Sequence, residues 1–320
     1  GERAMKGARN IVLASELPES VPATSVDRQC GSSQQALHFA AQAVMSGTMD
    51  IVIAGGAASM PRTPRFSTVL LPQKNGLGHY MSPELQLRYP NIEFSQFKGA
   101  EMMANQYAIS KDELDAYALN SHRRASEAVN KKAFEKEIVP IAIRDTEGIV
   151  TGETHNIDEG VRFDANLESI AGIKPILDGG LLTAGTASQI CDGASGLIVC
   201  NENGLKILGV EPLVRISHMS VIGHDPVIML EAPIPATKKA LKKTDMTIDS
   251  IDLFEVNEAF ASVPVAWSKA LHVEHHKVNV NGGAIALGHP LGSSGTKLAT
   301  TLIHSLRTRH KKLGLQTMCE

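Results

Sequence analysis

Two segments of the chain share one design, one near its start and one near its end. In the first, Ser25-Val26-Asp27 leads through a cysteine to Gly31-Ser32-Ser33; in the second, Lys277-Val278-Asn279 leads through a histidine to Gly292-Ser293-Ser294. Each Gly-Ser-Ser opens a stretch with apolar residues at helical spacing, and a short apolar strand follows. These two strands are expected at residues 50–54 and 315–319. The repeat predicts two β-α-β halves with right-handed crossovers and mostly parallel sheets.

The composition limits the partners that the chain can have. Of its 320 residues, 43% are hydrophobic and 20% charged, and the net charge is −3, which is typical of a globular protein of about two domain equivalents. The basic residues are scattered, so the sequence predicts no nucleic-acid binding and no membrane-surface patch. No apolar stretch approaches the roughly 18 residues of a membrane-spanning helix, so no membrane insertion is expected. Because Gly1-Glu2-Arg3-Ala4-Met5 resembles neither a signal peptide nor a translation start, we expect the chain to begin inside a longer protein.

The four cysteines do not form a disulfide framework or a zinc motif. Cys30, Cys191, Cys200 and Cys319 are widely spaced, and no Cys-x-x-Cys pair occurs. The cysteine pattern predicts a reducing compartment and no bound metal.

Changes in composition divide the chain into three parts. We expect a first half at residues 1–60 and 188–210, an inserted subdomain at residues 61–187, and a second half at residues 211–320. Within the polar insertion, Ser110-Lys111-Asp112-Glu113 is a capping box that predicts an amphipathic helix. Two further strands are predicted. They are residues 194–200, returning to the first sheet, and residues 252–256, entering a helix that follows Asn257.

A glycine-rich run surrounds one of the twelve histidines. Residues 278–296 contain five glycines around His289, and Pro290 follows directly. Glycine permits positive φ and close approach of the backbone, while proline fixes φ, so this run predicts a loop that aims one imidazole. The run is no phosphate-binding P-loop, because a histidine stands where that motif has lysine, and no dinucleotide motif follows a strand.

Cys30 is predicted to lie at the start of a helix, where the helix dipole stabilises a thiolate. A thiol with a pKa near 8.5 is only about 3% ionised at pH 7, and half ionisation requires roughly 2 kcal/mol. A helix end supplies about 0.3–1 kcal/mol. Cys30 as a nucleophile therefore requires a partner such as His289, whereas a buried core cysteine is the alternative interpretation.

From the residues alone, Asn257 has two interpretations and Cys319 has one. Asn257 lies between a predicted strand and a predicted helix, which favours a helix N-cap; its amide could instead face a developing oxyanion or a water. Cys319 ends a short apolar strand and could be a buried thiol.

Four ordered motifs resemble those of the thiolase family. They are Val26-Asp27-Arg28-Gln29-Cys30-Gly31-Ser32-Ser33, Asn257-Glu258-Ala259-Phe260-Ala261, Asn281-Gly282-Gly283 through Gly288-His289-Pro290-x-Gly292, and Thr317-Met318-Cys319. The resemblance extends over the whole chain, including residues 183–188 and 191–194. It implies an α/β fold of two duplicated β-α-β halves, layered αβαβα, with an inserted loop subdomain.

The resemblance implies an acyltransferase that cleaves 3-ketoacyl-CoA with CoA, giving acetyl-CoA and a shortened acyl-CoA. Cys30 would be the nucleophile that carries the acyl group, and His289 would activate it and contribute to an oxyanion site. Cys319 would act as general acid and base, and Asn257 would serve the oxyanion site through water. A thiolate suits this role because it is nucleophilic and forms an exchangeable thioester.

The resemblance also implies contacts with CoA, which is a substrate here; no covalently bound cofactor and no metal are implied. Its candidate residues are Arg162, Ser169, Ser188, Ala259 and Phe260. Arg162 could instead be a surface charge and Ser188 a helix cap. The family forms homodimers or homotetramers, and residues 67–80 could assist assembly. The compartment would be the cytoplasm in a bacterium and the mitochondrion or peroxisome in a eukaryote.

The chain departs from the family pattern at both ends. The opening strands of the family are absent, and the chain stops at Glu320, where a further oxyanion donor is expected, so we interpret it as a fragment of a working thiolase with an exposed sheet edge. Ser95-Gln96-Phe97-Lys98-Gly99 replaces the His-Met-Gly stretch of biosynthetic enzymes and favours the degradative class. The alternatives are a biosynthetic acetoacetyl-CoA thiolase, a decarboxylating ketoacyl synthase, which Cys319 argues against, and a non-catalytic acyl-CoA-binding or interaction protein.

Overall fold

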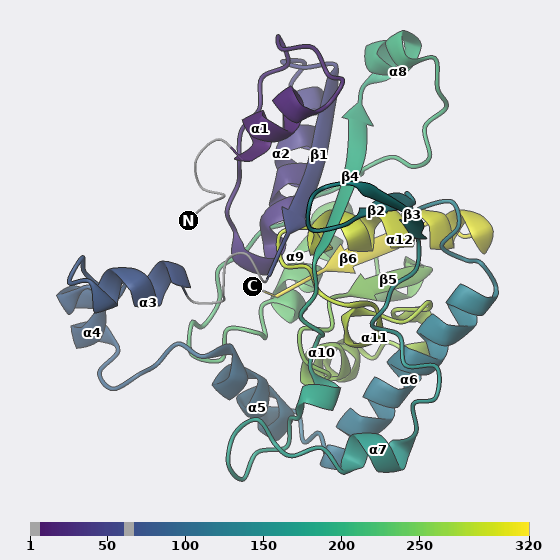
Figure 1. Ribbon diagram of the computed structural model, residues 1–320. Coiled ribbons are helices and arrows are strands. Elements are labelled where there is room, and N and C mark those ends of the chain that lie inside the picture. The colour runs from purple at the N-terminus through teal and green to yellow at the C-terminus, as the bar shows by residue number, and fades with distance from the viewer. Residues whose placement is uncertain (1–6, 61–66, 320) are drawn as a thin grey trace.

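The computed structural model describes residues 7–60 and 67–319. Its elements follow one another along the chain as the ribbon shows (Figure 1). Up to the second half they are α1 (Gly7–Ala14), α2 (Ser32–Met45), β1 (Ile51–Ala58), α3 (Ser67–Lys74), α4 (Pro83–Arg88), α5 (Gln96–Gln106), α6 (Lys111–Asn130), β2 (Ile141–Arg144), β3 (Val150–His155), α7 (Leu167–Ala171), β4 (Gly193–Cys200) and α8 (Glu202–Leu208). The second half contains α9 (Pro233–Thr244), β5 (Leu253–Val256), α10 (Ser262–Leu271), α11 (Ala284–Leu287), α12 (Ser294–Thr308) and β6 (Gly314–Thr317).

The first sheet joins β1 to β4 over eight residues each, with Ile51 opposite Cys200 and Ala58 opposite Gly193. Residues 194–200 do return to the first sheet, as predicted. The strands are antiparallel, so the expectation of mostly parallel sheets is wrong for this half. Some 130 residues separate β1 from β4, and so long an excursion does not impose the short helical crossover that makes neighbouring strands parallel.

The second sheet pairs β5 with β6 in parallel, from Leu253 opposite Gly314 to Val256 opposite Thr317. Its core side packs Phe254 edge-on against Trp267 of α10, with ring centroids 5.1 Å apart. Before His289, the chain forms only isolated bridges, Phe254 with Val278 and Val280 with Gly282, and residues 18–28 before Cys30 are irregular. The opening strand of each predicted β-α-β half is therefore not formed in the described residues.

Helices α2 and α12 pack against each other, and α12 contacts both sheets. At their N-termini, the backbone N–H of Thr296 donates to Ser33 Oγ at 3.1 Å. A side chain at Gly295 would overlap the backbone of Gln34, so only glycine allows this approach. The two Gly-Ser-Ser segments that first indicated a repeat thus lie side by side in the centre of the molecule.

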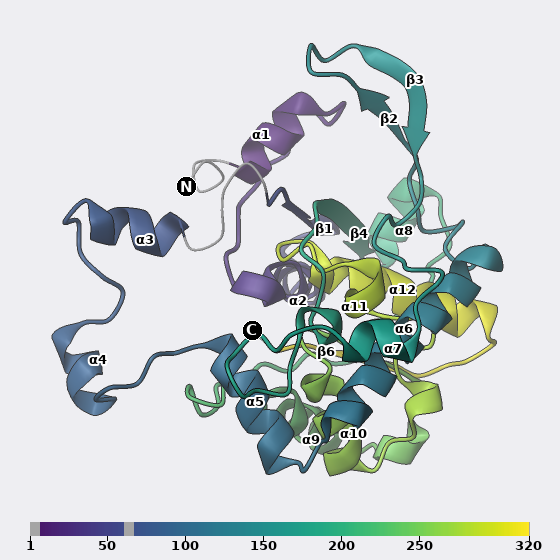
Figure 2. The same cartoon turned by 60° about the horizontal axis from the view of Figure 1, so that its bottom comes forward.

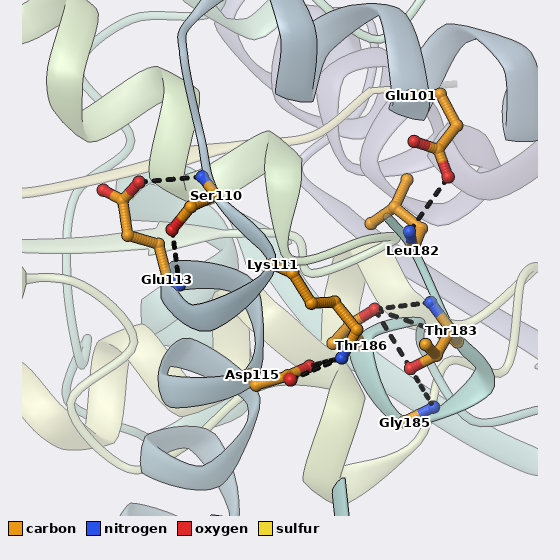
Figure 3. A network of polar contacts seen from close by, with 9 residues as sticks. All are labelled: Glu101, Ser110, Lys111, Glu113, Asp115, Leu182, Thr183, Gly185 and Thr186. Carbon is orange, nitrogen blue, oxygen red and sulfur yellow. Dashed lines mark hydrogen bonds and ion pairs between the residues drawn. The ribbon is translucent and has the colours of Figure 1, made fainter. Parts of the chain in front are cut away.

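The segment 67–187, within the predicted insertion, contains both packed and unpacked elements. The predicted helix is α6, whose capping box is confirmed: Ser110 Oγ accepts from the N–H of Glu113, whose carboxylate accepts from the N–H of Ser110 (Figure 3). By contrast, α3 and α4 bury no residue and reach out to one side of the body (Figures 1 and 2). The hairpin β2–β3, which the sequence analysis did not predict, is exposed at every position and projects from the molecule (Figure 2).

Within the described residues, no helix combines the length and apolar character needed to cross a membrane.

Candidate active site

Cys30 lies in a single helical turn, Gln29–Gly31, that runs directly into α2. Gln29 has a φ of +46°, which is uncommon for a residue with a side chain. The turn is held by Ser32, whose hydroxyl accepts from the N–H of Arg28 at 2.9 Å and donates to the carbonyl of Gln29 at 2.7 Å. The predicted position at a helix start is confirmed, and the thiol is half-buried there.

The loop around His289 depends on Gly288. This residue has φ +86° and ψ 161°, a region that only glycine adopts without strain. A Cβ at Gly288 would also overlap the sulfur of Cys191. The backbone N–H of His289 donates to the carbonyl of Gln189 at 3.0 Å. Both uses of glycine expected from the sequence, positive φ and close approach, therefore occur at this one position.

The His289 imidazole is only 5% exposed, and its orientation is fixed by a serine. Nδ1 lies 2.5 Å from Ser294 Oγ, and the same hydroxyl donates to the carbonyl of Pro290 at 3.1 Å. Because a hydroxyl carries one proton, Ser294 accepts from Nδ1–H. This arrangement makes Nε2 the basic nitrogen of the neutral ring.

Asn257 and Cys319 follow the ends of neighbouring parallel strands. The N–H of Asn257 donates to the carbonyl of Thr317 at 3.1 Å, and the two side chains are 1% and 2% exposed. Helix α10 begins only at Ser262, with Ala261 at the N-cap, so the helix-cap interpretation of Asn257 is wrong. Its amide oxygen and nitrogen have no hydrogen-bond partner within residues 7–60 and 67–319. A buried amide without partners costs about 1–3 kcal/mol, so this placement points to a role beyond stability.

One hydrogen-bonded junction brings the catalytic candidates together. Gln316 of β6 donates through Nε2 to Gln34 Oε1 of α2 at 2.9 Å and to the carbonyl of Gly295 in α12 at 2.7 Å. These three residues lie within four positions of Cys30, six of His289 and three of Cys319. A cavity of about 420 Å³ borders the junction, with Gly31 and Met318 in its lining. The structure therefore collects three segments that are far apart in sequence.

The candidate CoA-binding residues fall into two groups. Ala259 and Phe260 are buried in the same apolar cluster as Cys319, and Ser188 lies beside them because its N–H donates to the carbonyl of Ala259 at 3.0 Å. Ser188 is followed by β4, so it caps no helix. Arg162 and Ser169 are exposed on the insertion, next to α6 and in α7, and no hydrogen bond among the described residues links them to the first group.

A polar network fixes the segment that leads to Ser188. The Glu101 carboxylate accepts from the backbone N–H of Leu181 and of Leu182, both at 2.9 Å. Thr183 and Thr186 then cap each other, as Figure 3 shows. Glu101 was not among the residues predicted from the sequence; its only signal was a polar residue among the small residues of the buried α5 face.

Gln189 was also missed, although it holds the histidine loop from outside. Its side-chain amide donates to the carbonyl of Gly160 at 2.8 Å and to that of Ile285 at 2.7 Å. The only sequence signal was its place between residues 183–188 and 191–194, two stretches that the family resemblance includes.

Burial changes the pKa values of two ionisable groups near the candidate catalytic residues. Burial raises the pKa of the Cys191 thiol, so this cysteine is a poor nucleophile at neutral pH. Burial also raises the pKa of Glu255, two residues before Asn257, well above its usual range. No group of three or more histidine, cysteine, aspartate or glutamate side chains that could hold a metal occurs in the described part of the chain.

Comparisons with known proteins place the chain in one family. Residues 1–203 match the thiolase N-terminal domain and residues 210–320 the thiolase C-terminal domain. A steroid 3-ketoacyl-CoA thiolase of Mycobacterium tuberculosis is 46% identical over all of this chain and 77% of that protein. The 3-ketoacyl-CoA thiolase of Aliivibrio fischeri is 41% identical over 99% of this chain and 80% of that protein. Human mitochondrial 3-ketoacyl-CoA thiolase superposes with a TM-score of 0.85 at 35% identity, covering 100% of this chain and 81% of that one.

Proposed function

Because the chain belongs to the thiolase family, we propose that it cleaves 3-ketoacyl-CoA with CoA to give acetyl-CoA and a shortened acyl-CoA. Relatives at 46% and 41% identity carry the name 3-ketoacyl-CoA thiolase. The observation that carries the proposal is the Gln34–Gln316–Gly295 junction, which gathers the segments of Cys30, Cys319 and His289. The fold is the α/β fold of the thiolases, and the enzyme is an acyltransferase.

The first half-reaction transfers the acyl group to Cys30. His289 Nε2 takes the Cys30 proton, and the thiolate attacks the 3-keto carbon of the substrate. The bond between C2 and C3 breaks, its electron pair leaves with the acetyl-CoA carbon, and Cys319 donates a proton to that carbon. Acetyl-CoA departs, and the shortened acyl group stays on Cys30 as a thioester.

The second half-reaction transfers the acyl group from Cys30 to the thiol of CoA. Cys319, now a thiolate, takes the proton of an incoming CoA thiol, whose sulfur attacks the acyl carbon. Cys30 leaves as a thiolate and takes back its proton from His289, which returns both groups to their starting state. Asn257 has a buried amide whose atoms have no hydrogen-bond partner among the described residues, and it lies next to the strand that leads to Cys319. We assign it, acting through water and together with His289, to the oxyanion that forms as the carbonyl is attacked.

CoA is the substrate in this proposal, and no metal takes part. A solved human relative contains CoA. Ala259 and Phe260 would line the thioester end, since they lie in the cluster that holds Cys319. Ser188, beside Ala259, and Ser169 would lie along the pantetheine, and the exposed Arg162 would contact the adenine end of CoA.

We propose that the protein belongs to the degradative class of thiolases and not to the biosynthetic class. At the position of the biosynthetic His-Met-Gly stretch, Phe97 packs edge-on against Phe260, with ring centroids 5.6 Å apart. The biosynthetic alternative has the Bacillus anthracis acetyl-CoA acetyltransferase as a structural neighbour, with a TM-score of 0.84 at 34% identity. The identities to named 3-ketoacyl-CoA thiolases are higher.

We further propose the division expected from the sequence, with residues 1–60 and 188–210 and residues 211–320 as two halves around an insertion at 61–187. The two separate sheets β1–β4 and β5–β6 support it. A homodimer or homotetramer is proposed, in which the unpacked α3 and α4 make contacts between copies. The compartment would be cytoplasmic for a bacterial source and mitochondrial or peroxisomal for a eukaryotic one, and the human neighbour is a mitochondrial protein.

The direct test incubates the protein with acetoacetyl-CoA or a longer 3-ketoacyl-CoA and CoA, and follows acetyl-CoA. We expect CoA-dependent formation of acetyl-CoA, and its loss in Cys30→Ala and in Cys319→Ala. Absence of acetyl-CoA with the wild-type protein, combined with unchanged acyl-CoA binding by Cys30→Ala, would favour a binding protein over an enzyme. Full cleavage by Cys319→Ala would show that the second cysteine has no role.

A further inference from the structure

Glu258, next to Asn257, is buried in a site made entirely of hydrogen-bond donors. Its side chain is 1% exposed. Oε1 accepts from Tyr117 Oη at 2.9 Å and from Asn279 Nδ2 at 3.0 Å. Oε2 accepts from Ser121 Oγ at 2.7 Å and from the backbone N–H of Ile285 at 3.0 Å. All four acceptor positions of a carboxylate are used.

These donors come from three parts of the chain. Tyr117 and Ser121 lie on α6 of the insertion, Asn279 precedes the histidine loop, and Ile285 lies in α11, which ends two residues before His289. Asn279 also exchanges two hydrogen bonds of 2.8 Å with the backbone of Val256 at the end of β5. The carboxylate therefore joins the end of the strand that carries Asn257 to the loop that carries His289.

The histidine loop is also shaped around this carboxylate. A side chain at Gly283 would overlap the carboxyl group of Glu258, and the N–H of Gly283 donates to Ser121 Oγ at 3.1 Å. The start of α11 thus packs directly on Glu258. A shift of this side chain would move α11, and with it His289, relative to Asn257.

We propose that Glu258 is a positioning residue, which sets the placement of the His289 imidazole relative to the Asn257 amide through its four hydrogen bonds. The inference rests on the proposed thiolase function, because only there do these two groups act on one substrate. Glu258 itself contacts no reacting atom in this account. A displacement of about 1 Å between catalytic groups can cost on the order of 100-fold in rate.

The test substitutes Glu258→Gln, which keeps the shape but replaces one acceptor oxygen with an NH₂ group. Either orientation of the new amide turns a donor against a donor, at Asn279 Nδ2 or at the N–H of Ile285. We expect kcat to fall 10- to 100-fold while KM for both substrates stays within twofold. We also expect the pH profile of Cys30 alkylation by iodoacetamide to move to higher pH, because the imidazole that activates the thiol is displaced. A loss of stability alone would not move this profile.

Glu255→Gln is the matched control. Glu255 is as buried as Glu258 and lies three positions earlier, yet neither of its oxygens has a hydrogen-bond partner in the described part of the chain. We expect kcat and the alkylation profile of this variant to equal those of the wild type.

Other outcomes overturn the inference. A folded Glu258→Gln variant with wild-type kcat and alkylation profile would do so, as would a raised KM at unchanged kcat. If Glu258→Gln does not fold, Ser121→Ala decides, since it deletes one donor and the contact to Gly283; a several-fold lower kcat at unchanged KM supports the inference and a wild-type kcat refutes it. Failure of the wild-type protein to cleave 3-ketoacyl-CoA would instead refute the proposed function.

Discussion

At His289, one hydroxyl group determines which ring nitrogen carries the proton. Ser294 accepts from Nδ1 and donates to Pro290, so Nε2 is available as the base. Ser294→Ala removes this acceptor and allows the other tautomer, in which Nε2 carries the proton. We expect about a tenfold lower kcat, which is part of the roughly 100- to 10,000-fold that general base catalysis contributes, with little change in KM, measured by steady-state thiolysis.

Ser293 provides the control for this prediction. It is 1% exposed, directly precedes Ser294, and its hydroxyl has no hydrogen-bond partner among the described residues. Ser293→Ala should therefore retain the wild-type kcat. Equal rates for Ser294→Ala and Ser293→Ala would show that the serine does not set the tautomer.

Glu137 makes stability depend on pH. Burial raises its pKa from 4.5 to about 7, so between these values the unfolded chain releases a proton that the folded protein retains. The free energy of unfolding must then fall as pH rises through this range, by roughly 3 kcal/mol in total. Glu137→Gln should remove this loss and gain stability over the wild type at pH 8 relative to pH 5, as measured by urea unfolding.

The exposed Glu147 of the β2–β3 hairpin supplies a control carboxylate. Glu147→Gln should leave the difference between pH 5 and pH 8 unchanged. If Glu137→Gln shows the same pH dependence as the wild type, the buried carboxyl is not the group that titrates.

At the scale of elements, the turn between α11 and His289 tolerates no side chain. Gly288→Ala combines a strained backbone with overlap on Cys191. We expect a destabilisation of about 1–3 kcal/mol from the backbone alone and a severe loss of kcat, measured by thermal unfolding and by thiolysis. Adding Cys191→Gly should relieve the overlap but not the backbone strain.

Gly76→Ala is a control that introduces backbone strain without steric overlap. Gly76 also has a positive φ, of +67°, but nothing lies within 4 Å of a Cβ built there. This variant should lose some stability and keep full activity. A fully active Gly288→Ala variant would contradict the assigned role of the turn.

Local sequence signals predicted the helices well, because their determinants lie within a few residues of each other. The Ser110–Glu113 box and the apolar spacing after each Gly-Ser-Ser are of this kind. The orientation of β1 against β4 has no local determinant, so the expected parallel pairing failed. The sequence of the β2–β3 hairpin did contain turn-forming residues, from Asp145 to Gly148, and Gly148 adopts a φ of +85° in the structure. The strands of this hairpin lack a clear alternation of apolar and polar residues, so the sequence did not predict them.

The site was predictable only in part. Cys30 and His289 stand out, since each sits where backbone geometry is demanding, and the family motifs add Cys319 and Asn257. Asn257 illustrates the limit: its place between a strand and a helix favours a cap, and only the delayed start of α10 and the buried, unpartnered amide reveal otherwise. Glu258, Gln189 and Ser294 act through partners 5 to 141 positions away, which no local pattern encodes.

For the whole molecule, the projecting α3–α4 segment predicts self-association. Leu71 is 56% exposed and Leu77 79% exposed, although both are large apolar residues. The double variant Leu71→Glu, Leu77→Glu should lower the molar mass measured by light scattering to that of a smaller oligomer. Ile141→Glu, an equally exposed position on the β2–β3 hairpin at 60%, should leave the mass unchanged. A wild-type mass for the double variant at all concentrations would place the interface elsewhere.

The junction of Gln34, Gly295 and Gln316 also determines when the segments of Cys30, His289 and Cys319 meet during folding. Gln34 and Gln316 are separated by 282 positions, and Ser33 and Thr296 by 263. During synthesis Cys30 leaves the ribosome 259 residues before His289 and 289 residues before Cys319. Contacts of such long range form late in folding. A growing chain therefore contains Cys30 well before it contains His289, and the proposed activation of this thiol begins only when the segments of the junction meet.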